Sequence, residues 1–338
     1  MVWEDVTSAW SVNSVPFAFP LAPAIKMNGS SITEFVFLNF SFSRSAQFYL
    51  LMLVLTCYAT VLLGNLLIMV TVWSEPRLFQ CPMYLFLSNL SLLDMTMGSV
   101  AAPKLATDLL NSGSTISYRG CMAQIFGLHF FGSAEIFLLA VMAYDRYVAI
   151  CHPLRYTTII NPQRCFSLLL LCWAGGLIHG ICQTVIMAQL PYCGANVLDN
   201  FFCEIPQLIK LACSDVYVAE MVIVVSDAVI TLPGFLTLLV SYATILATLC
   251  GHFGKGGRKA LSTCSSHLTV VCLFYGPVIF VYMKPSSNSQ VDKMASVIYT
   301  VITPALNPLI YTLRNQEMKG AMGKMKQKFT RLFLDQRE

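Results

Sequence analysis

Residues 140–156 read AVMAYDRYVAICHPLRY, and this stretch decides how the rest of the chain is interpreted. It begins inside a long apolar run in which an acid, Asp145, is followed directly by a base, Arg146. The run ends at Cys151, and Pro153 leads into a short polar loop. Charged side chains are costly in a membrane unless they are paired or functional. The stretch therefore predicts the end of a membrane helix that carries a functional charge pair.

The composition supports a membrane protein. Of the 338 residues, 56% are hydrophobic and only 11% are charged. Soluble domains usually have about 25% charged residues. The 13 cysteines form no C-x-x-C pair, so the sequence gives no support to a zinc ribbon or a thioredoxin-like redox site.

Seven apolar runs succeed one another, each near the ~20 residues that a helix needs to cross a bilayer. Polar residues interrupt the second, third and seventh runs, and a basic amphipathic stretch comes after them at 316–332. We expect an all-α membrane protein, a bundle of seven transmembrane helices with a short amphipathic eighth helix. The runs cover residues 49–73, 83–105, 123–150, 165–186, 218–249, 262–282 and 294–313.

Three regions are expected along the chain. Residues 1–48 would form an extracellular N-terminus, residues 49–313 the transmembrane domain, and residues 314–338 a cytoplasmic tail with the amphipathic helix. Residues 1–26 contain three prolines and differ in composition from the rest of the chain, so we expect a disordered extension and a second start site at Met27. Asn28 and Asn39 each begin an N-x-S glycosylation sequon.

The distribution of positive charge predicts the orientation. Seven spans place the two termini on opposite sides, and the side that holds the C-terminus carries 14 of the 21 lysines and arginines. The positive-inside rule makes that side cytoplasmic. The sequons and four cysteines then lie outside, where disulfides form and where four cysteines allow three pairings. These cysteines are Cys121, Cys193, Cys203 and Cys213.

Polar residues inside the predicted spans mark a polar core. Asp94 and Glu135 are acids deep in spans two and three, and Glu135 lies close to three helical turns before Arg146 on the same face. Together with Asn65, Asn307 and Ser91 they could form a polar cavity, and a hydrogen-bonded network without an ion is the alternative. Asp227 in span five is a third intramembrane acid, which faces either a ligand or a structural partner.

Several motifs resemble those of one known family. The residues MAYDRYVAIC at 142–151 resemble the helix-three signature of olfactory receptors, a branch of the rhodopsin-like (class A) G-protein-coupled receptors. Gly64-Asn65 is similar too, the resemblance covers about residues 28–333, and residues 129–145 are most similar to the family-4 branch. The other matching motifs are PMYLFLSNLSLLD at 82–94, KALSTCSSHL at 259–268, FYGP at 274–277 and PALNPLIYTLRN at 304–315.

The resemblance implies an odorant receptor that binds small volatile ligands and activates a stimulatory, olfactory-type G protein to raise cAMP. It implies a multi-pass protein of the plasma membrane, in olfactory cilia, with its N-terminus outside. It also implies the disulfides Cys121–Cys203 and Cys193–Cys213. The wider class holds a sodium ion near the position of Asp94, so sodium at Asp94 and Glu135 is the one cofactor expected, and no nucleic-acid partner is expected.

Helical periodicity and the resemblance together suggest two sets of functional residues. The ligand pocket would be lined by Leu128, His129, Gly132, Ser133, Ser226, Asp227, Ile230, Tyr275, Val278, Ile279, Tyr282 and Thr300. A mostly apolar lining with a few hydroxyls suits a small, weakly polar ligand. For His129, a packed structural histidine is the alternative. The residues for G-protein coupling and switching would be Asp145, Arg146, Tyr147, Tyr242, Asn307, Pro308 and Tyr311.

One position departs from the family pattern. Olfactory receptors often have a histidine before the phenylalanines of the loop at 200–204, and copper binding has been proposed around it. This chain has Asn200 there, so we predict no metal site with Cys203 and Glu204.

Two other classes of function have less support. An ion-coupled transporter or channel could use the intramembrane acids, but it would show internal repeats with broken helices at matching positions, and none is evident. An enzyme is not expected, because no nucleophile–base arrangement or metal-ligand spacing occurs. The glycine-rich segment at 254–259 satisfies neither a P-loop nor a dinucleotide fingerprint, and we interpret it as a flexible basic loop.

Overall fold

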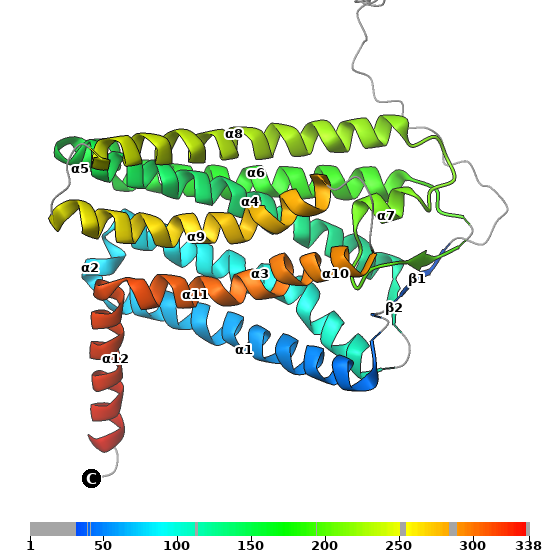
Figure 1. Cartoon of the computed structure of the whole chain (residues 1–338), viewed down its shortest axis with the longest axis horizontal. Coiled ribbons are helices and arrows are strands. Elements are labelled where there is room, and N and C mark those ends of the chain that lie inside the picture. The colour runs from blue at the N-terminus through cyan, green and yellow to red at the C-terminus, as the bar shows by residue number, and fades with distance from the viewer. Residues whose placement is uncertain are drawn as a thin grey trace, which may run out of the picture. The chain divides into compact units, whose positions relative to one another are not determined.

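A computed structural model describes residues 32–335 except 39, 41, 112–113, 194, 251–254 and 284–288. The expected extension at 1–26 and both sequon asparagines, Asn28 and Asn39, lie outside the described residues. Seven long helical segments run side by side (Figure 1). They are α1 (Arg44–Ser74), α3 (Pro82–Leu110), α4 (Tyr118–Cys151), α6 (Pro162–Gln189), α8 (Tyr217–Cys250), α9 (Lys255–Met283) and the series α10 (Ser289–Val297), η2 (Ile298–Ile302) and α11 (Thr303–Arg314).

Six helices of the described chain are long and apolar enough to cross a membrane, and α9 completes the bundle. Helices of 28 to 34 residues, such as α6 and α4, are about 42–51 Å long, which exceeds the ~30 Å hydrocarbon core of a bilayer. This excess explains why α1 begins at Arg44 rather than at the predicted residue 49. The predicted seven-helix architecture is confirmed.

The shorter elements gather at the two ends of the bundle. One end carries α2 (Pro76–Phe79), the 3₁₀ turn η1 (Pro153–Arg155), α5 (Tyr156–Ile159) and the final helix α12 (Gln316–Asp335). We call it the α12 end, because α12 runs across it rather than along the bundle (Figure 1). The segment predicted to be a basic loop is helical from Lys255 onward, since α9 begins there, so that part of the prediction was wrong.

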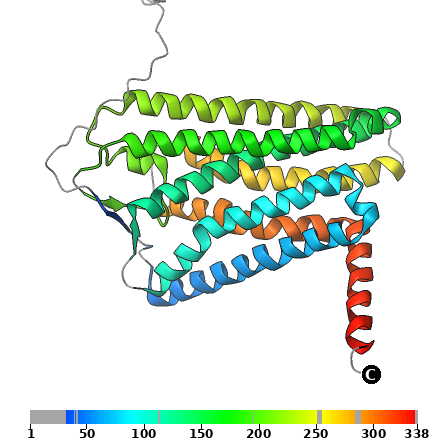
Figure 2. The same cartoon turned by 180° about the vertical axis from the view of Figure 1, so that it is seen from behind.

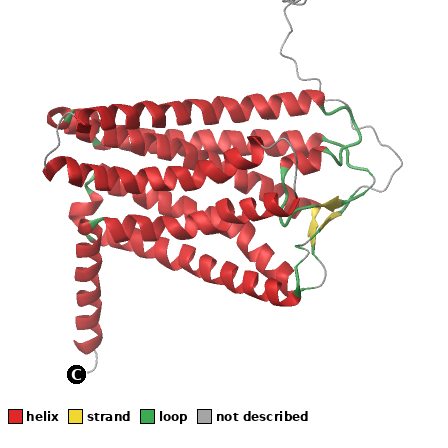
Figure 3. Cartoon of the chain, viewed as in Figure 1, coloured by secondary structure: helices red, strands yellow, loops and turns green. Residues whose placement is uncertain are grey.

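The opposite end carries a small β-sheet (yellow in Figure 3) and a short helix, α7 (Ile205–Ile209). Strand β1 (Glu34–Phe37) lies between β2 (Thr115–Ser117), to which it is antiparallel, and β3 (Val197–Leu198), to which it is parallel. The segment before α1 is therefore held by the loops that precede α4 and follow α6. We call the three strands and residues 199–213 the loop cap.

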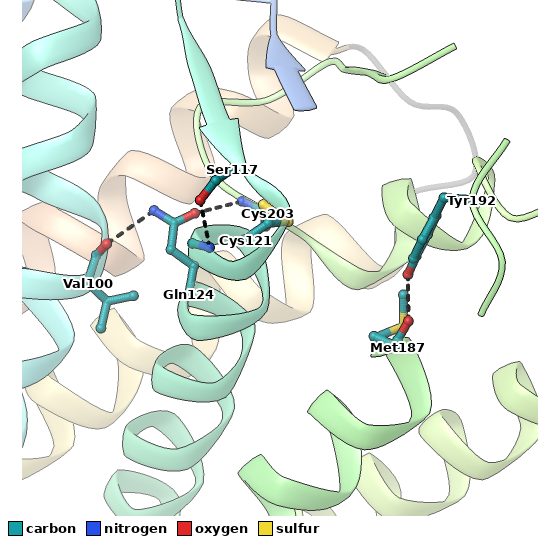
Figure 4. The surroundings of a disulfide bond; sticks show 8 residues. Val100, Ser117, Cys121, Gln124, Met187, Tyr192 and Cys203 are labelled. Carbon is teal, nitrogen blue, oxygen red and sulfur yellow. Dashed lines mark hydrogen bonds between the residues drawn. A yellow bond between two sulfur atoms is a disulfide. The ribbon is translucent and has the colours of Figure 1, made fainter. Parts of the chain in front are cut away.

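Two disulfides fasten the loop cap. Cys121–Cys203 links the first turn of α4 to the loop after α6, and Cys193–Cys213 closes that loop on itself, as the resemblance implied. The first is supported by Gln124, whose Oε1 accepts from the Cys203 backbone N–H at 3.1 Å and whose Nε2 donates to the Val100 carbonyl at 3.2 Å (Figure 4). The side chain of Gln124 thus joins α3, α4 and the loop cap.

Lys293 of α10 also anchors the loop cap. Its ammonium group is 2.6 Å from the Asp199 carboxylate and donates to the Leu38 carbonyl at 2.8 Å, although the side chain is only 2% exposed. A buried ammonium group is costly without partners. This pair therefore ties the loop cap to the seventh helical segment.

The seventh segment is irregular. A π-helical turn, η2, precedes α11, and Pro308 lies inside α11, where it removes one backbone hydrogen bond. Gly64 of α1 packs there: a Cβ added at Gly64 would lie 3.0 Å from both Cβ and Cγ of Pro308. The absence of a side chain at Gly64 lets α1 approach the proline.

Helix α4 lies inside the bundle and packs against α3, α6 and α8 (Figure 2). Its contact with α6 depends on two glycines of α6. A Cβ on Gly176 would lie 2.6 Å from the Phe130 carbonyl oxygen and 2.9 Å from Ala134 Cβ. A Cβ on Gly180 would lie 2.9 Å from Phe130 Cβ. Small residues at such interfaces let two membrane helices approach closely.

Replacing Gly176 by alanine should push α4 and α6 apart. We expect Gly176→Ala to lower stability by about 1–3 kcal/mol, the usual cost of overpacking, because backbone cannot yield as a side-chain tip can. Unfolding temperature in detergent measures this effect. Gly320→Ala on α12 is the control, since an added Cβ there meets nothing within 4 Å. Equal unfolding temperatures of the two variants would contradict the proposed contact between α4 and α6.

Candidate functional site

Polar side chains from three helices meet in the half of the bundle nearer the loop cap. Ser133 of α4 is hydrogen-bonded to His179 Nδ1 of α6 at 2.7 Å, and His179 Nε2 is 3.1 Å from Asp227 Oδ1 of α8. Gln183, one turn after His179, donates from Nε2 to Asp227 Oδ1 at 3.0 Å and to Ser226 Oγ at 3.2 Å. His179 and Gln183 are buried. These side chains form one network across the α4, α6 and α8 interfaces.

His129 lies beside this network, one turn before Ser133 on α4. Its ring meets the His179 ring edge-on, with the centroids 5.5 Å apart. A metal-binding atom of each of His129, His179 and Asp227 lies within 4.8 Å of the other two. The structure thus brings together three of the predicted pocket residues, His129, Ser133 and Asp227.

The other predicted pocket residues are distributed more widely. Tyr275 of α9 is buried against Phe235, and its hydroxyl has no hydrogen-bond partner among the described residues. Thr300 is fully buried and donates to the Ser296 carbonyl of its own helix at 2.7 Å. The remaining members differ in burial. The partly buried ones are Leu128, Gly132, Ser226 and Ile230, and Ile279 is 40% exposed. The side chains of Val278 and Tyr282 are not described.

A second polar group lies deeper in the bundle. Asn307 of α11 donates from Nδ2 to Asp94 Oδ1 of α3 at 2.8 Å, and Asn65 of α1 donates to the carbonyls of Val61 and Pro304. Glu135 is a buried acid of α4. These four side chains and Ser91 are all buried, as the predicted polar core requires. Among the described residues, the amide oxygens of Asn65 and Asn307 have no hydrogen-bond partner.

At the α12 end, the predicted charge pair of Asp145 and Arg146 is present. Arg146 Nε is 3.9 Å from Asp145 Oδ2, and Asp145 Oδ1 accepts a 2.7 Å hydrogen bond from the Tyr156 hydroxyl of α5. Asp145 is 2% exposed. Burial, and then the adjacent Asp145 carboxylate, raise the pKa of Tyr156, so that its hydroxyl keeps the proton that it donates. The hydrogen bond from Tyr156 to Asp145 therefore holds α5 against the end of α4.

A cavity opens beside this pair. It is lined by Arg146 and, around it, by Met83, Leu87, Met142, Ser266, His267, Tyr311 and Asn315. Tyr242 of α8, another predicted switch residue, is buried and hydrogen-bonded to His267 of α9. Tyr147 is hydrogen-bonded to His152 at 3.0 Å. The structure thus places Arg146 and Tyr311 on one cavity, while Tyr242 pairs with a histidine that lines the same cavity.

The start of helix α12 is hydrogen-bonded to α3 at this end of the bundle. The Tyr84 hydroxyl of α3 donates to Glu317 at 2.9 Å and to Asn315 at 3.2 Å. Asn315 in turn accepts from the backbone N–H of Glu317 and Met318 at the start of α12. These bonds explain why α12 turns away from α11 at this point.

In the loop cap, Asn200 donates to Glu204 Oε2 at 3.0 Å. Burial raises the pKa of the Glu204 carboxyl, and the hydrogen bond from Asn200 opposes this shift. Cys203 is in a disulfide, which removes it as a thiolate ligand. The pairing of Asn200 and Glu204 is thus a local contact of the loop.

Comparison with known proteins supplies the family. The profile of a family described as "Olfactory receptor" matches residues 54–328. Human Olfactory receptor 4Q3 is 54% identical over 301 residues, which are 89% of this chain and 96% of that protein. Human Olfactory receptor 4S2 is 50% identical over 296 residues (88% and 95%), and mouse Olfactory receptor 4E2 is 48% identical over 302 residues (89% and 98%).

The chain belongs to the olfactory receptor family. These relatives carry family-4 names, which confirms the branch suggested by residues 129–145. Olfactory receptors are multi-pass membrane proteins that bind odorants and couple to G proteins, and they are not enzymes. Nothing in these comparisons supports the transporter or channel alternative.

Two residues of this olfactory receptor's polar network were missed in the sequence. His179 and Gln183 lie in an otherwise apolar fourth span, and neither was assigned a role. Their spacing of four residues, which places both on one helical face, was the available signal. Only the packing of α6 on α4 reveals that this face meets Ser133 and Asp227.

The Tyr156–Asp145 bond offers a test of the receptor's α12 end. Tyr156→Phe leaves a buried carboxylate without one donor, so we expect a loss of about 1–3 kcal/mol of stability. Thermal unfolding of the purified receptor measures the loss. Tyr144→Phe is the matched control, because Tyr144 is 39% exposed and precedes Asp145 directly. A Tyr156→Phe variant as stable as Tyr144→Phe would contradict a structural role for this bond.

Proposed function

We propose that this olfactory receptor binds small volatile odorants between α4, α8, α9 and the seventh helical segment, and signals through a stimulatory, olfactory-type G protein that raises cAMP. The observation that carries the proposal is the separation of two sites on one helix. His129 and Ser133 near the loop cap, and Arg146 on the cavity at the α12 end, all belong to α4. Ligand and G protein would thus act on the same helix from its two ends.

The chemistry of the side chains supports the proposed ligand pocket. The partly buried residues combine apolar side chains with hydroxyl and imidazole groups, which suits small ligands of low polarity. A ligand shifts the receptor between states only by its different affinity for them. Tyr275 and the His129–Asp227 region lie on different helices, so a ligand that contacts both would favour one relative position of α9 and α8.

The charge of Arg146 supports the residues proposed for G-protein coupling. Arg146 is permanently charged, and its ion pair with Asp145 is long, at 3.9 Å. It lines a cavity that a G-protein segment could enter, together with Tyr311. Asp145, Tyr147, Tyr242, Asn307 and Pro308 are proposed to act as switch elements around it.

The orientation and location are also proposals. The excess of lysine and arginine on the side of the C-terminus supports a cytoplasmic α12 end and an extracellular N-terminus. Two disulfides at the opposite end suit an oxidising exterior. Residence in the plasma membrane of olfactory cilia is proposed from the family.

A cell-based assay tests the function. The full-length receptor with an N-terminal epitope tag is expressed with a cAMP reporter and exposed to odorant panels. We expect tag staining on intact cells and odorant-dependent cAMP, which Arg146→Ala abolishes because Arg146 is the only lysine or arginine among the described residues that line the cavity. Arg155→Ala, which removes an exposed arginine near the same end, should respond like the wild type at equal surface staining. An equal response of Arg146→Ala would refute the coupling role.

We further propose that Asp94 and Glu135 hold a sodium ion. Hard cations prefer oxygen ligands. Asn307 is hydrogen-bonded to Asp94, and its amide oxygen and that of Asn65 are buried without a hydrogen-bond partner among the described residues. Ligands that bind only the folded state raise stability by mass action. We expect NaCl to raise the unfolding temperature above that in choline chloride of equal ionic strength, and Asp94→Asn to remove the difference. Glu220→Gln, an exposed acid, should keep it, and a shift that survives in Asp94→Asn would disprove the site.

A further inference from the structure

The side chains of His179, Gln183 and Asp227 lie within hydrogen-bond distance of one another. The Gln183 amide nitrogen lies 2.9 Å from His179 Nε2, 3.0 Å from Asp227 Oδ1 and 3.2 Å from Ser226 Oγ. An amide group has two N–H bonds, so it can satisfy at most two of these three atoms. The Ser226 hydroxyl itself donates to the Ile223 carbonyl at 2.9 Å.

Neutral His179 has two tautomers in this network. With the proton on Nε2, the ring donates to Asp227 and its Nδ1 accepts from the Ser133 hydroxyl. If His179 Nδ1 carries a proton and donates it to Ser133, then the Nε2 lone pair faces a carboxylate oxygen 3.1 Å away. Two lone pairs at that separation repel each other in a low-dielectric interior unless a positive charge lies between them. This second tautomer, with Ser133 at Nδ1, therefore presents His179 Nε2 and the Asp227 carboxylate as a pair of ligand atoms for a cation.

The third ligand is His129. Its metal-binding nitrogen lies within 4.8 Å of the ligand atoms of His179 and Asp227. Zinc–ligand bonds of about 2.0–2.2 Å in a tetrahedral site place the ligand atoms about 3.4 Å apart. The His179 and Asp227 ligand atoms, 3.1 Å apart, are close to this spacing, and the His129 nitrogen, within 4.8 Å of both, reaches it with a movement of at most about 1.4 Å.

We propose that His129, His179 and Asp227 bind a divalent zinc-type metal ion. Two imidazoles and one carboxylate are a donor set that zinc accepts, with a fourth position left for water. Ser133 holds His179 from the far side of its ring, as outer hydrogen bonds do for metal-ligating histidines. The Asp227 side chain is 39% exposed, so it is not closed off by the neighbouring helices. The site is separate from Cys203 and Glu204, and it shares His129 and Asp227 with the proposed odorant pocket.

Zinc binding to the purified full-length receptor in nanodiscs tests the proposal. Equilibrium dialysis against Zn²⁺ alone should show one ion bound per receptor. His179→Gln and Asp227→Asn should abolish it, whereas the matched variants His152→Gln and Asp215→Asn should bind as the wild type does. Ser133→Ala retains every ligand and should weaken binding by about 10- to 100-fold, the usual effect of losing an outer hydrogen bond. No bound zinc, or equal binding by Asp227→Asn and the wild type, would overturn the proposal.

A measurement on the wild type alone removes dependence on how the variants fold. X-ray absorption at the zinc edge of the loaded receptor should show nitrogen and oxygen ligands with two imidazoles. A spectrum with sulfur ligands, or with fewer than two imidazoles, would place the ion elsewhere and overturn the proposal.

Discussion

The close approach of α4 and α6 is the contact on which the polar interior depends. Gly176 and Gly180 have no side chains, so the two backbones meet where any Cβ would collide with Phe130. His179 lies between these glycines in the sequence and reaches Ser133 across the same interface. A wider separation of α4 and α6 would remove that bond and leave buried polar groups unsatisfied, which is costly in a membrane interior. Packing at small residues thus makes the polar network possible.

The same constraint explains the deeper core. Asp94 and Asn307 are more than 200 residues apart in the chain, yet each is the other's hydrogen-bond partner. Neither could be accommodated alone among apolar side chains, because a buried polar group without a partner is unfavourable. The Gly64–Pro308 contact brings α1 to the same region, so that Asn65, the next residue, reaches the carbonyl of Pro304. Polar pairs therefore fix the mutual register of α1, α3 and α11.

The sequence alone predicted those parts of the molecule that local composition determines. Apolar runs marked the seven helices, and the resemblance supplied the two disulfides, which the structure contains. Helix limits were less predictable, because Arg44 and Tyr118 belong to helices that extend beyond their apolar runs. The pairing of β1 with β2 and β3 left no signal, since it joins short segments that lie far apart in the chain. His179 was missed for a related reason: its partners are set by helix packing, which no local pattern records.

The arrangement of the loop cap has a consequence for biosynthesis. All four disulfide cysteines and all three strands precede residue 214, whereas α8, α9 and the seventh segment come after it. Both covalent links can therefore close on the nascent chain before the last three spans are made. The contacts of the loop cap with the final helices, such as Lys293 with Asp199 and Tyr299 with Phe202, are added later. A chain that stalls after α6 would already carry a crosslinked cap, so oxidation state alone would not tell a cell's quality control whether the bundle is complete.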